Sequence, residues 1–416
     1  MIARSARFAL RGFAFATVVL ASREASAAGT AVDVQSGRAT GMASASTAMV
    51  DDSSAIYFNP AGMANGRRLD AQVGAAFIMP AFKFENAQTG NKTTVPFYVV
   101  PPPHAYVSTA ITEGLHAGVG VFSPYGLLVK WPEDWEGRTI STRSQLETFY
   151  INPTLAYRIG PLRIGAGLQI VRGTVMLSRN IRFAPGLDEG SVTLGAGTWG
   201  VGGNGGVQLD LINRLLTLGV HYRSAVKLDF DGNAHFNNVP TAFSPIIHDQ
   251  VVSTSLTQPD QLAMGVAVRP FEKMVFDLDV VWIGWGKMRN IDLNFPEDQS
   301  GTLKQTFPKN WNNTANVHFG GEYSFDQNWQ VRGGAMFDPT PSPSDTLTPE
   351  IPDASRLNLA AGGSYRHDSG FRVDLGYQFI FFFSKTSTAP QLPGDYGGNV
   401  NLIGLTLGYQ MPERQN

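Results

Sequence analysis

The chain holds few side chains whose types and spacing are typical of catalysis. Its seven histidines lie far apart, at positions 104, 116, 221, 235, 248, 318 and 367, and it has no cysteine. A hydrolytic enzyme that works through a covalent intermediate needs a nucleophile, a base and an orienting group within reach of one another. The sequence contains neither a Gly-x-Ser-x-Gly turn nor a His-Glu-x-x-His pair. We therefore expect a protein that is not an enzyme.

Two local patterns could still bind a cofactor or a metal. Residues 195–200 spell Gly-Ala-Gly-Thr-Trp-Gly, the glycine spacing of a dinucleotide-binding turn, but a further glycine-rich stretch follows instead of a helix. Glycine crowding in a sheet is the better interpretation. His318 and Glu322 share one face of an alternating stretch and could ligate a metal, although isolated polar side chains explain them better. We expect no metal and no cofactor.

The elements that carry these residues repeat with a period of two. In residues 371–381, Phe371, Val373 and Leu375 lie on one face, and Arg372 and Asp374 on the other. Similar segments of about ten residues recur about fourteen times, many with aromatic residues near their ends. Short connections such as 159–161 alternate with long polar ones around 124–144, 180–192, 237–256, 294–311, 338–355 and 386–398.

The start of the chain has the pattern of a secretory signal. Basic residues precede an apolar stretch over 13–21, and Ala25-Ser26-Ala27 forms a cleavage pattern, so that the mature chain would begin near Ala28. Beyond it, no apolar run is long enough for a transmembrane helix. Only 16% of the residues are charged, and the mature chain is mildly acidic with no basic stripe for nucleic acid.

A soluble sandwich would also alternate, but the number and length of the segments favour an all-β antiparallel transmembrane β-barrel of about 14 strands. Such a barrel places apolar side chains toward lipid and satisfies every backbone hydrogen bond by closure. We expect a signal peptide at 1–27, an N-terminal hatch at 28–67, the barrel at 68–411 and a tail at 412–416. That tail is a departure from barrels that end on an aromatic residue.

Several blocks, in order, are similar to the FadL-type family of outer-membrane transporters of hydrophobic compounds. They include the Asp51-Asp52 pair, the Asn59-Pro60-Ala61-Gly62 turn and the stretches 118–138, 220–236, 277–288, 310–325 and 351–382. The resemblance implies that the N-terminal segment folds inside the barrel as a plug, with Asp51, Asp52, Asn59, Pro60, Ala61 and Gly62 as its motif. A disordered exported tail is the alternative, although Ile56, Tyr57 and Phe58 are too apolar for solvent.

The resemblance also implies a route for a hydrophobic solute. The matching kink in the third strand is Ser123-Pro124-Tyr125-Gly126, where proline and glycine would interrupt pairing and open a gap in the wall; an ordinary strand end is the alternative. Leu127, Leu128, Trp131 and Trp135 follow in a loop expected to be exposed, as a capture groove or as lipid anchors. We also expect Phe58 to contact the ligand and Arg172 to contact its headgroup. The alternative for Arg172 is an ion pair with an acidic residue inside the barrel.

The implied function is passive uptake of hydrophobic compounds by loop capture, binding in a pocket and lateral release through the wall. Long-chain fatty acids are the expected substrate, with aromatic or other neutral hydrocarbons as the alternative and a general porin as a third possibility. The expected partners are the hydrophobic solute and the lipid of the bacterial outer membrane, without nucleic acid, and the expected state is a monomer.

Overall fold

The computed structural model describes residues 29–65, 67–212, 214–298 and 300–411. The signal peptide and the tail predicted from the sequence lie outside the described residues. The strands of the large sheet are β1 (Leu69–Asn86), β2 (Lys92–Thr94), β3 (Pro103–Ala110), β4 (Leu115–Phe122), β5 (Gly126–Lys130), β6 (Arg143–Ile159), β7 (Leu162–Ile181), β8 (Gly190–Leu211), β9 (Leu216–Arg223), β10 (Val226–Asn237), β11 (Gln250–Gln258), β12 (Gln261–Phe271), β13 (Met274–Ile283), β16 (Thr314–Ser324), β17 (Trp329–Asp338), β18 (Arg356–Arg366), β19 (Phe371–Ser387) and β20 (Gly394–Gln410).

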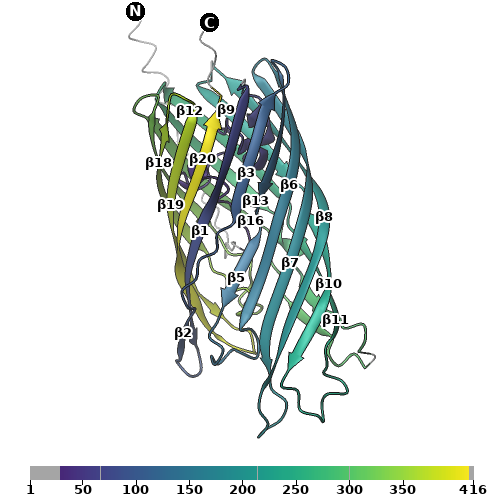
Figure 1. Ribbon diagram of the computed structural model, residues 1–416. Coiled ribbons are helices and arrows are strands. Elements are labelled where there is room, and N and C mark those ends of the chain that lie inside the picture. The colour runs from purple at the N-terminus through teal and green to yellow at the C-terminus, as the bar shows by residue number, and fades with distance from the viewer. Residues whose placement is uncertain (1–28, 66, 213, 299, 412–416) are drawn as a thin grey trace, which may run out of the picture.

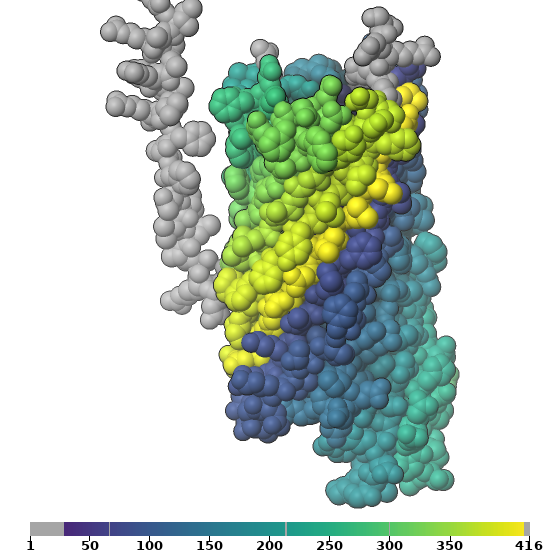
Figure 2. All heavy atoms as spheres, turned by 60° about the vertical axis from the view of Figure 1, so that its left-hand side comes forward, coloured from purple at the N-terminus to yellow at the C-terminus, as the bar shows by residue number. Residues whose placement is uncertain are grey.

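These strands close into an antiparallel barrel of 14 strand positions (Figure 1). The closing pair is β1 with β20, which run side by side from Asp70 opposite Gln410 to Asn86 opposite Gly394. Figure 2 shows this seam as the border between the purple and the yellow strands. Closure leaves no sheet edge along this seam, as a bilayer requires. The predicted fold is confirmed.

Some strand positions are interrupted, which explains why more strands than positions are present. Strands β4 and β5 both pair with β6, and β9 and β10 both pair with β8. In the same way β11 pairs with β10, and β12 pairs with β9. In addition, the short β2 pairs antiparallel with the end of β1, and β14 (Asn290–Leu293) pairs with β15 (Gln305–Pro308) in a separate hairpin.

The two ends of the barrel differ in their connections. Where β1 begins and β20 ends, the connections are short, and at the opposite end they are long (Figure 1). We call these the short-turn end and the long-loop end. The predicted loops agree in order, except that the one around 124–144 contains β5 and the one around 294–311 contains β15.

The side chains of the wall alternate as the sequence predicts. On β19, Phe371 and Leu375 are 64% and 53% exposed, whereas Arg372 and Asp374 are buried. The exposed series is apolar along the other strands too, so the outer face suits lipid and the inner face is polar.

The interior of the barrel holds residues 30–65, which we call the N-terminal segment. It contains the helices α1 (Gly37–Thr40), α2 (Ala55–Phe58) and η1 (Pro60–Met63). Helix α1 contacts β18, β19 and β20, whereas η1 contacts β6, β7 and β8. A short helix η2 (Trp285–Lys287) follows β13. Among the described residues, no helix is long and apolar enough to span a membrane.

Candidate functional site

The Asn59-Pro60-Ala61-Gly62 motif forms the start of helix η1. Pro60 is its first residue, where a missing N–H costs nothing. Asn59 caps it, because its Oδ1 accepts a hydrogen bond from the backbone N–H of Ala61 at 3.2 Å. Its Nδ2 donates to the carbonyl oxygen of Thr47 at 2.9 Å and to that of Val207, in β8, at 3.1 Å. The motif therefore fixes its own turn and ties it to the wall.

Glycines allow this turn to pack closely. A Cβ atom on Gly62 would lie 2.4 Å from the carbonyl oxygen of Val50. A Cβ atom on Gly165, in β7, would lie 2.5 Å from the carbonyl carbon of Pro60. Only a residue without a side chain fits either position.

The two aspartates of the motif belong to an ion-pair network that crosses the interior. Arg38 lies 2.7 Å from Asp51, 3.2 Å from Asp52 and 3.0 Å from Glu322 of β16. Asp52 also lies 3.5 Å from Arg372 of β19. The network joins the N-terminal segment to two separate strands, and Glu322 is one of its members.

The predicted kink coincides with a break in the strand. Strand β4 ends at Phe122 and β5 begins at Gly126, and the N-terminal segment fills the vacated pairing positions. Val32 donates its N–H to the carbonyl of Pro124 at 2.8 Å, and Gly126 donates to the carbonyl of Thr30 at 2.9 Å. The interruption is therefore stabilised from inside the barrel.

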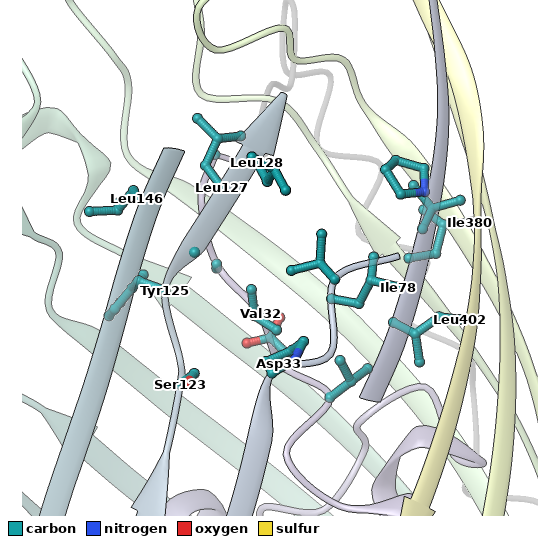
Figure 3. Close-up of a pocket in the computed structure, with 18 of the residues that line it drawn as sticks. Val32, Asp33, Ile78, Ser123, Tyr125, Leu127, Leu128, Leu146, Ile380 and Leu402 are labelled. Carbon is teal, nitrogen blue, oxygen red and sulfur yellow. The ribbon is translucent and has the colours of Figure 1, made fainter. Parts of the chain in front are cut away.

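A cavity of about 260 Å³, the inner cavity, lies beside this break (Figure 3). Its lining comes from the N-terminal segment, from the break, from residues 100–103 and from β1, β5, β6 and β17–β20. The apolar side chains that line it include Val32, Val34, Ile78, Phe82, Val100, Leu127, Leu128, Leu146, Met336, Ile380, Phe382, Val400 and Leu402. Phe149, which is 38% exposed on the outer face, also lines it. The inner cavity thus extends to the outside of the wall.

The charged side chains around the inner cavity are mainly acidic. Asp33, Glu147 and Asp353 line it together with Arg356. Arg356 is already paired with Asp338, whose Oδ2 lies 2.5 Å from its NH2 atom. Burial is the main cause that raises the pKa of Asp353, in the loop before β18, to about 6. Arg356 is therefore already neutralised by Asp338, and above that pH Asp353 adds a further negative charge to the cavity.

A second cavity of about 100 Å³, the outer cavity, lies toward the long loops. Its apolar lining consists of Leu127, Ile140, Leu146, Val175, Leu177, Val192, Leu194, Phe230, Leu256, Met288, Ile291, Leu293, Phe307 and Ile351. Leu127, Gln145 and Leu146 line both cavities. The two cavities are therefore neighbours that share one boundary.

The outer cavity carries cations. Lys309 is buried at its edge, donates a hydrogen bond to Thr348 at 2.7 Å and lies 4.0 Å from Glu350. Arg179 donates to the side-chain oxygen of Gln305 at 2.8 Å and, among the described residues, has no carboxylate within 4.0 Å.

The structure contradicts the expected headgroup contact at Arg172, because this side chain lies on the outer face of the wall. Its neighbours Val171 and Gly173 are buried, whereas Arg172 lies over the ring of Trp199 at 5.6 Å and donates to the carbonyl of Thr198 at 2.9 Å. It lines neither cavity. Sequence reasoning missed Arg179, which the period of two would have placed inside together with Val171 and Gly173.

The predicted exposed groove is also wrong at its tryptophans. Trp131 and Trp135 are 3% and 4% exposed, and their rings stack with centroids 4.5 Å apart. They pack with side chains from other long loops, among them Leu347 and Leu392. Leu127 and Leu128 line the inner cavity, and their role as ligand contacts stays a prediction. Phe58 packs against Tyr57 instead and lines neither cavity.

Residues 18–411 match the family described as outer membrane protein transport protein (OMPP1/FadL/TodX). The chain belongs to this family. It is therefore an outer-membrane protein of a family that transports hydrophobic compounds. The expectation drawn from the sequence blocks is confirmed at this level.

Relatives and solved structures agree with this assignment. The long-chain fatty acid transport protein of Escherichia coli (strain K12) is 25% identical over 94% of this chain and 96% of its own length. The 47 kDa outer membrane protein of Pasteurella multocida is 21% identical over 98% of this chain and 100% of its own.

In fold, the barrel is similar to a FadL homologue from Pseudomonas aeruginosa, with a TM-score of 0.83 and 18% identity over 92% of this chain and 100% of that one. It is also similar to the toluene transporter TbuX of Ralstonia pickettii, with a TM-score of 0.72 and 17% identity over 91% and 99%.

Proposed function

We propose that this chain carries long-chain fatty acids across the outer membrane by binding them in the two cavities and releasing them sideways through the wall. The observation that carries the proposal is the position of the cavities. They share Leu127 and Leu146, and the inner one reaches Phe149 on the outer face. An apolar chain gains about 0.8 kcal/mol for each CH₂ group removed from water, so a continuous apolar route favours such a solute.

The charges suggest how a fatty acid would lie. Arg179 and Lys309 would hold the carboxylate in the outer cavity, because ionised pairs form the stronger hydrogen bonds. The hydrocarbon tail would extend past Leu127 and Leu146 into the inner cavity, where Asp33 and Asp353 disfavour a second anion.

The N-terminal segment would close the lumen as a plug. Its residues contact strands on opposite sides of the barrel, from β4 and β6–β8 to β18–β20. A dissolved ion would then have no straight path through the barrel, whereas a solute in the inner cavity would need only to pass the break at Ser123–Gly126 to reach lipid. Because ions would have no straight path, the function of a general porin suits this structure less well.

Neutral hydrocarbons are the second candidate substrate. The inner cavity has more acidic than basic side chains, and its one arginine is paired with Asp338. A neutral solute would avoid repulsion there and would not need Arg179. One relative is named for long-chain fatty acid transport and one structural neighbour for toluene transport, so both classes occur among similar proteins.

Uptake by cells tests the proposal and separates the two substrates. Cells that lack their own transporter of this family are supplied with labelled oleate or labelled toluene, with and without this chain. We expect the chain to raise the initial rate of oleate uptake, with a smaller effect on toluene. The reverse order would favour the neutral substrate, and no increase with either solute would contradict the proposal.

A further inference from the structure

Residues 96–103, Pro-Phe-Tyr-Val-Val-Pro-Pro-Pro, continue the line of β3 along the edge of β1. Ile78 and Val100 exchange two backbone hydrogen bonds of 2.9 Å, and Ala76 donates to the carbonyl of Pro102 at 3.1 Å. The stretch therefore belongs to the wall, but it is paired only on the side that faces β1.

The other side of this stretch faces the break between β4 and β5. Strands β3 and β4 pair from Ala110 opposite His116 to Ala105 opposite Val121, and the described ladder stops there. The same register continued would place Pro103 opposite Ser123, Pro101 opposite Tyr125 and Tyr98 opposite Leu128. We call the unpaired interval between 98–103 and 123–128 the wall opening.

Backbone geometry explains why the wall opening does not pair. Residues 100 and 102 direct their backbone groups toward β1, so residues 101 and 103 must direct theirs toward the opening, because direction alternates along a strand. Both are prolines, which have no N–H to donate. On the opposite edge, Ser123 exchanges hydrogen bonds with the side chain of Gln35 in the N-terminal segment, at 2.8 and 3.2 Å.

A single hydrogen bond spans the wall opening in the described part of the chain. The hydroxyl of Tyr98 donates to the carbonyl of Leu128 at 2.6 Å. The Nζ atom of Lys130 lies 5.7 Å from the centre of the same ring, within the range of a cation–π contact. Between this contact and the paired part of β3, the inner cavity is lined by Val100 and Pro101–Pro103 on one edge and by Ser123 and Tyr125–Leu128 on the other.

We propose that Pro101 and Pro103 hold the wall opening unpaired, and that Tyr98 is a latch at its long-loop end that limits the size of the solute that leaves. This inference rests on the proposed lateral release. In this account both edges cause the opening. The break at Pro124 removes the partner strand on one edge, and Pro101 and Pro103 lack the N–H donors on the other.

The first test restores the missing donors. The variant Pro101→Ala/Pro103→Ala places two N–H groups toward the opening, whereas the control Pro153→Ala adds an N–H on β6, at a wall position that lines neither cavity. Each restored hydrogen bond should favour a closed wall on the order of fivefold. We expect the initial rate of oleate uptake to fall by that factor or more in the double variant and to stay unchanged in Pro153→Ala, with oleate binding to purified protein retained in both. Equal uptake by the two variants would overturn the inference.

The second test concerns the latch. Tyr98→Phe removes the hydroxyl and keeps the ring, and Tyr377→Phe is its control, because the Tyr377 hydroxyl donates to Asn401 at 2.6 Å on the wall between β19 and β20. We expect Tyr98→Phe alone to raise the uptake of a bulky, branched fatty acid on the order of fivefold. Identical rates in the two variants would contradict the latch.

A cross-link covers the case in which a proline variant fails to fold. Since the chain has no cysteine, Tyr98→Cys/Leu128→Cys can be joined specifically by a short, reducible bifunctional reagent. Uptake should fall after the reaction and return after reduction, and the single variants should not respond. If the wild-type chain takes up no oleate, the proposed function fails; if it does and the cross-link changes nothing, only this inference fails.

Discussion

Two arginines on β7, seven residues apart, face opposite sides of the barrel wall. Arg172 lies over Trp199 on the outer face, and Arg179 lines the outer cavity. An odd separation along a strand always exchanges the two faces. Position along the strand therefore decides which of the two arginines faces lipid and which faces the cavity.

This pair provides a matched test of headgroup binding. Arg179→Gln should weaken the binding of oleate to purified protein about tenfold or more, because a hydrogen bond to a charged group contributes about 1.5–3 kcal/mol. Arg172→Gln should leave the dissociation constant unchanged, and neither variant should affect toluene. Fluorescence titration measures the binding of oleate and of toluene to each variant. Equal weakening of oleate binding by both substitutions would contradict the role of Arg179.

Asp353 makes stability depend on pH. Burial raises the pKa of this carboxyl from 3.8 to about 6, so the folded state binds its proton more tightly than the unfolded state. The free energy of unfolding should therefore fall as the pH rises from about 4 to above 6, by at most about 3 kcal/mol.

Asp353→Asn should remove this dependence, whereas Asp345→Asn, in an exposed part of the same loop, should preserve it. Denaturant unfolding in detergent at about pH 4 and about pH 8 measures the difference. The assignment would be contradicted if, at about pH 8, the wild-type protein had a larger free energy of unfolding than the Asp353→Asn variant.

Single residues show where sequence reasoning succeeds. Alternation along 371–381 correctly separates Phe371 and Leu375, which face lipid, from Arg372 and Asp374, which face the interior. The same rule applied to β7 identifies the face of Arg172. Trp131 and Trp135 were beyond its reach, because their burial depends on distant loops that contribute Leu347 and Leu392.

At the scale of elements, the stretch 46–49 of the N-terminal segment is held by two carboxylates of one strand. On β13, Asp279 accepts hydrogen bonds from the N–H groups of Ser46 and Thr47 at 2.8 and 2.9 Å. Asp277 accepts from Met49 at 3.0 Å and from Ala48 at 3.3 Å. Four consecutive N–H groups of the segment thus depend on two side chains of the wall.

Removing these carboxylates should loosen the segment and spare the barrel. Asp277→Ala/Asp279→Ala leaves the four donors without partners, at a cost of about 1–3 kcal/mol for each that stays buried. The backbone ladder of β13 is unaffected. In planar bilayers we expect the double variant to show large ion-conducting openings, and the wild-type chain and Asp229→Ala, a change on the exposed side of β10, to show none. A double variant as closed as the wild type would contradict this anchoring role.

Elements with a strong local signal could be predicted and those made by long-range pairing could not. The turn at Asn59–Gly62 and the break at Pro124 are visible because proline, glycine and a capping residue act locally. The interruption between β9 and β10 and the edge formed by 98–103 depend on register across the barrel. Three consecutive prolines at 101–103 were the available signal for that edge, and their meaning required the neighbouring strand.

For the whole molecule, the closed and filled barrel has different consequences for polar and for apolar solutes. Under the proposed function, the closed wall and the N-terminal segment would restrict water and ions, while the inner cavity reaches the outer face at Phe149 beside the wall opening. Length, alternation and composition predict the barrel, because they reflect the bilayer. They do not predict two adjoining cavities, whose walls come from residues 30–34, the long loops and several strands.

The route itself can be tested by labelling. A long-chain fatty acid with a photoreactive group near its methyl end is allowed to bind the reconstituted wild-type chain, is activated by light, and the labelled peptides are identified by mass spectrometry. Lateral release predicts label on residues 98–103 and 123–128, the two edges of the wall opening. Label found instead at the short-turn end of the lumen, around the ion pair of Arg163 with Asp210, would contradict it.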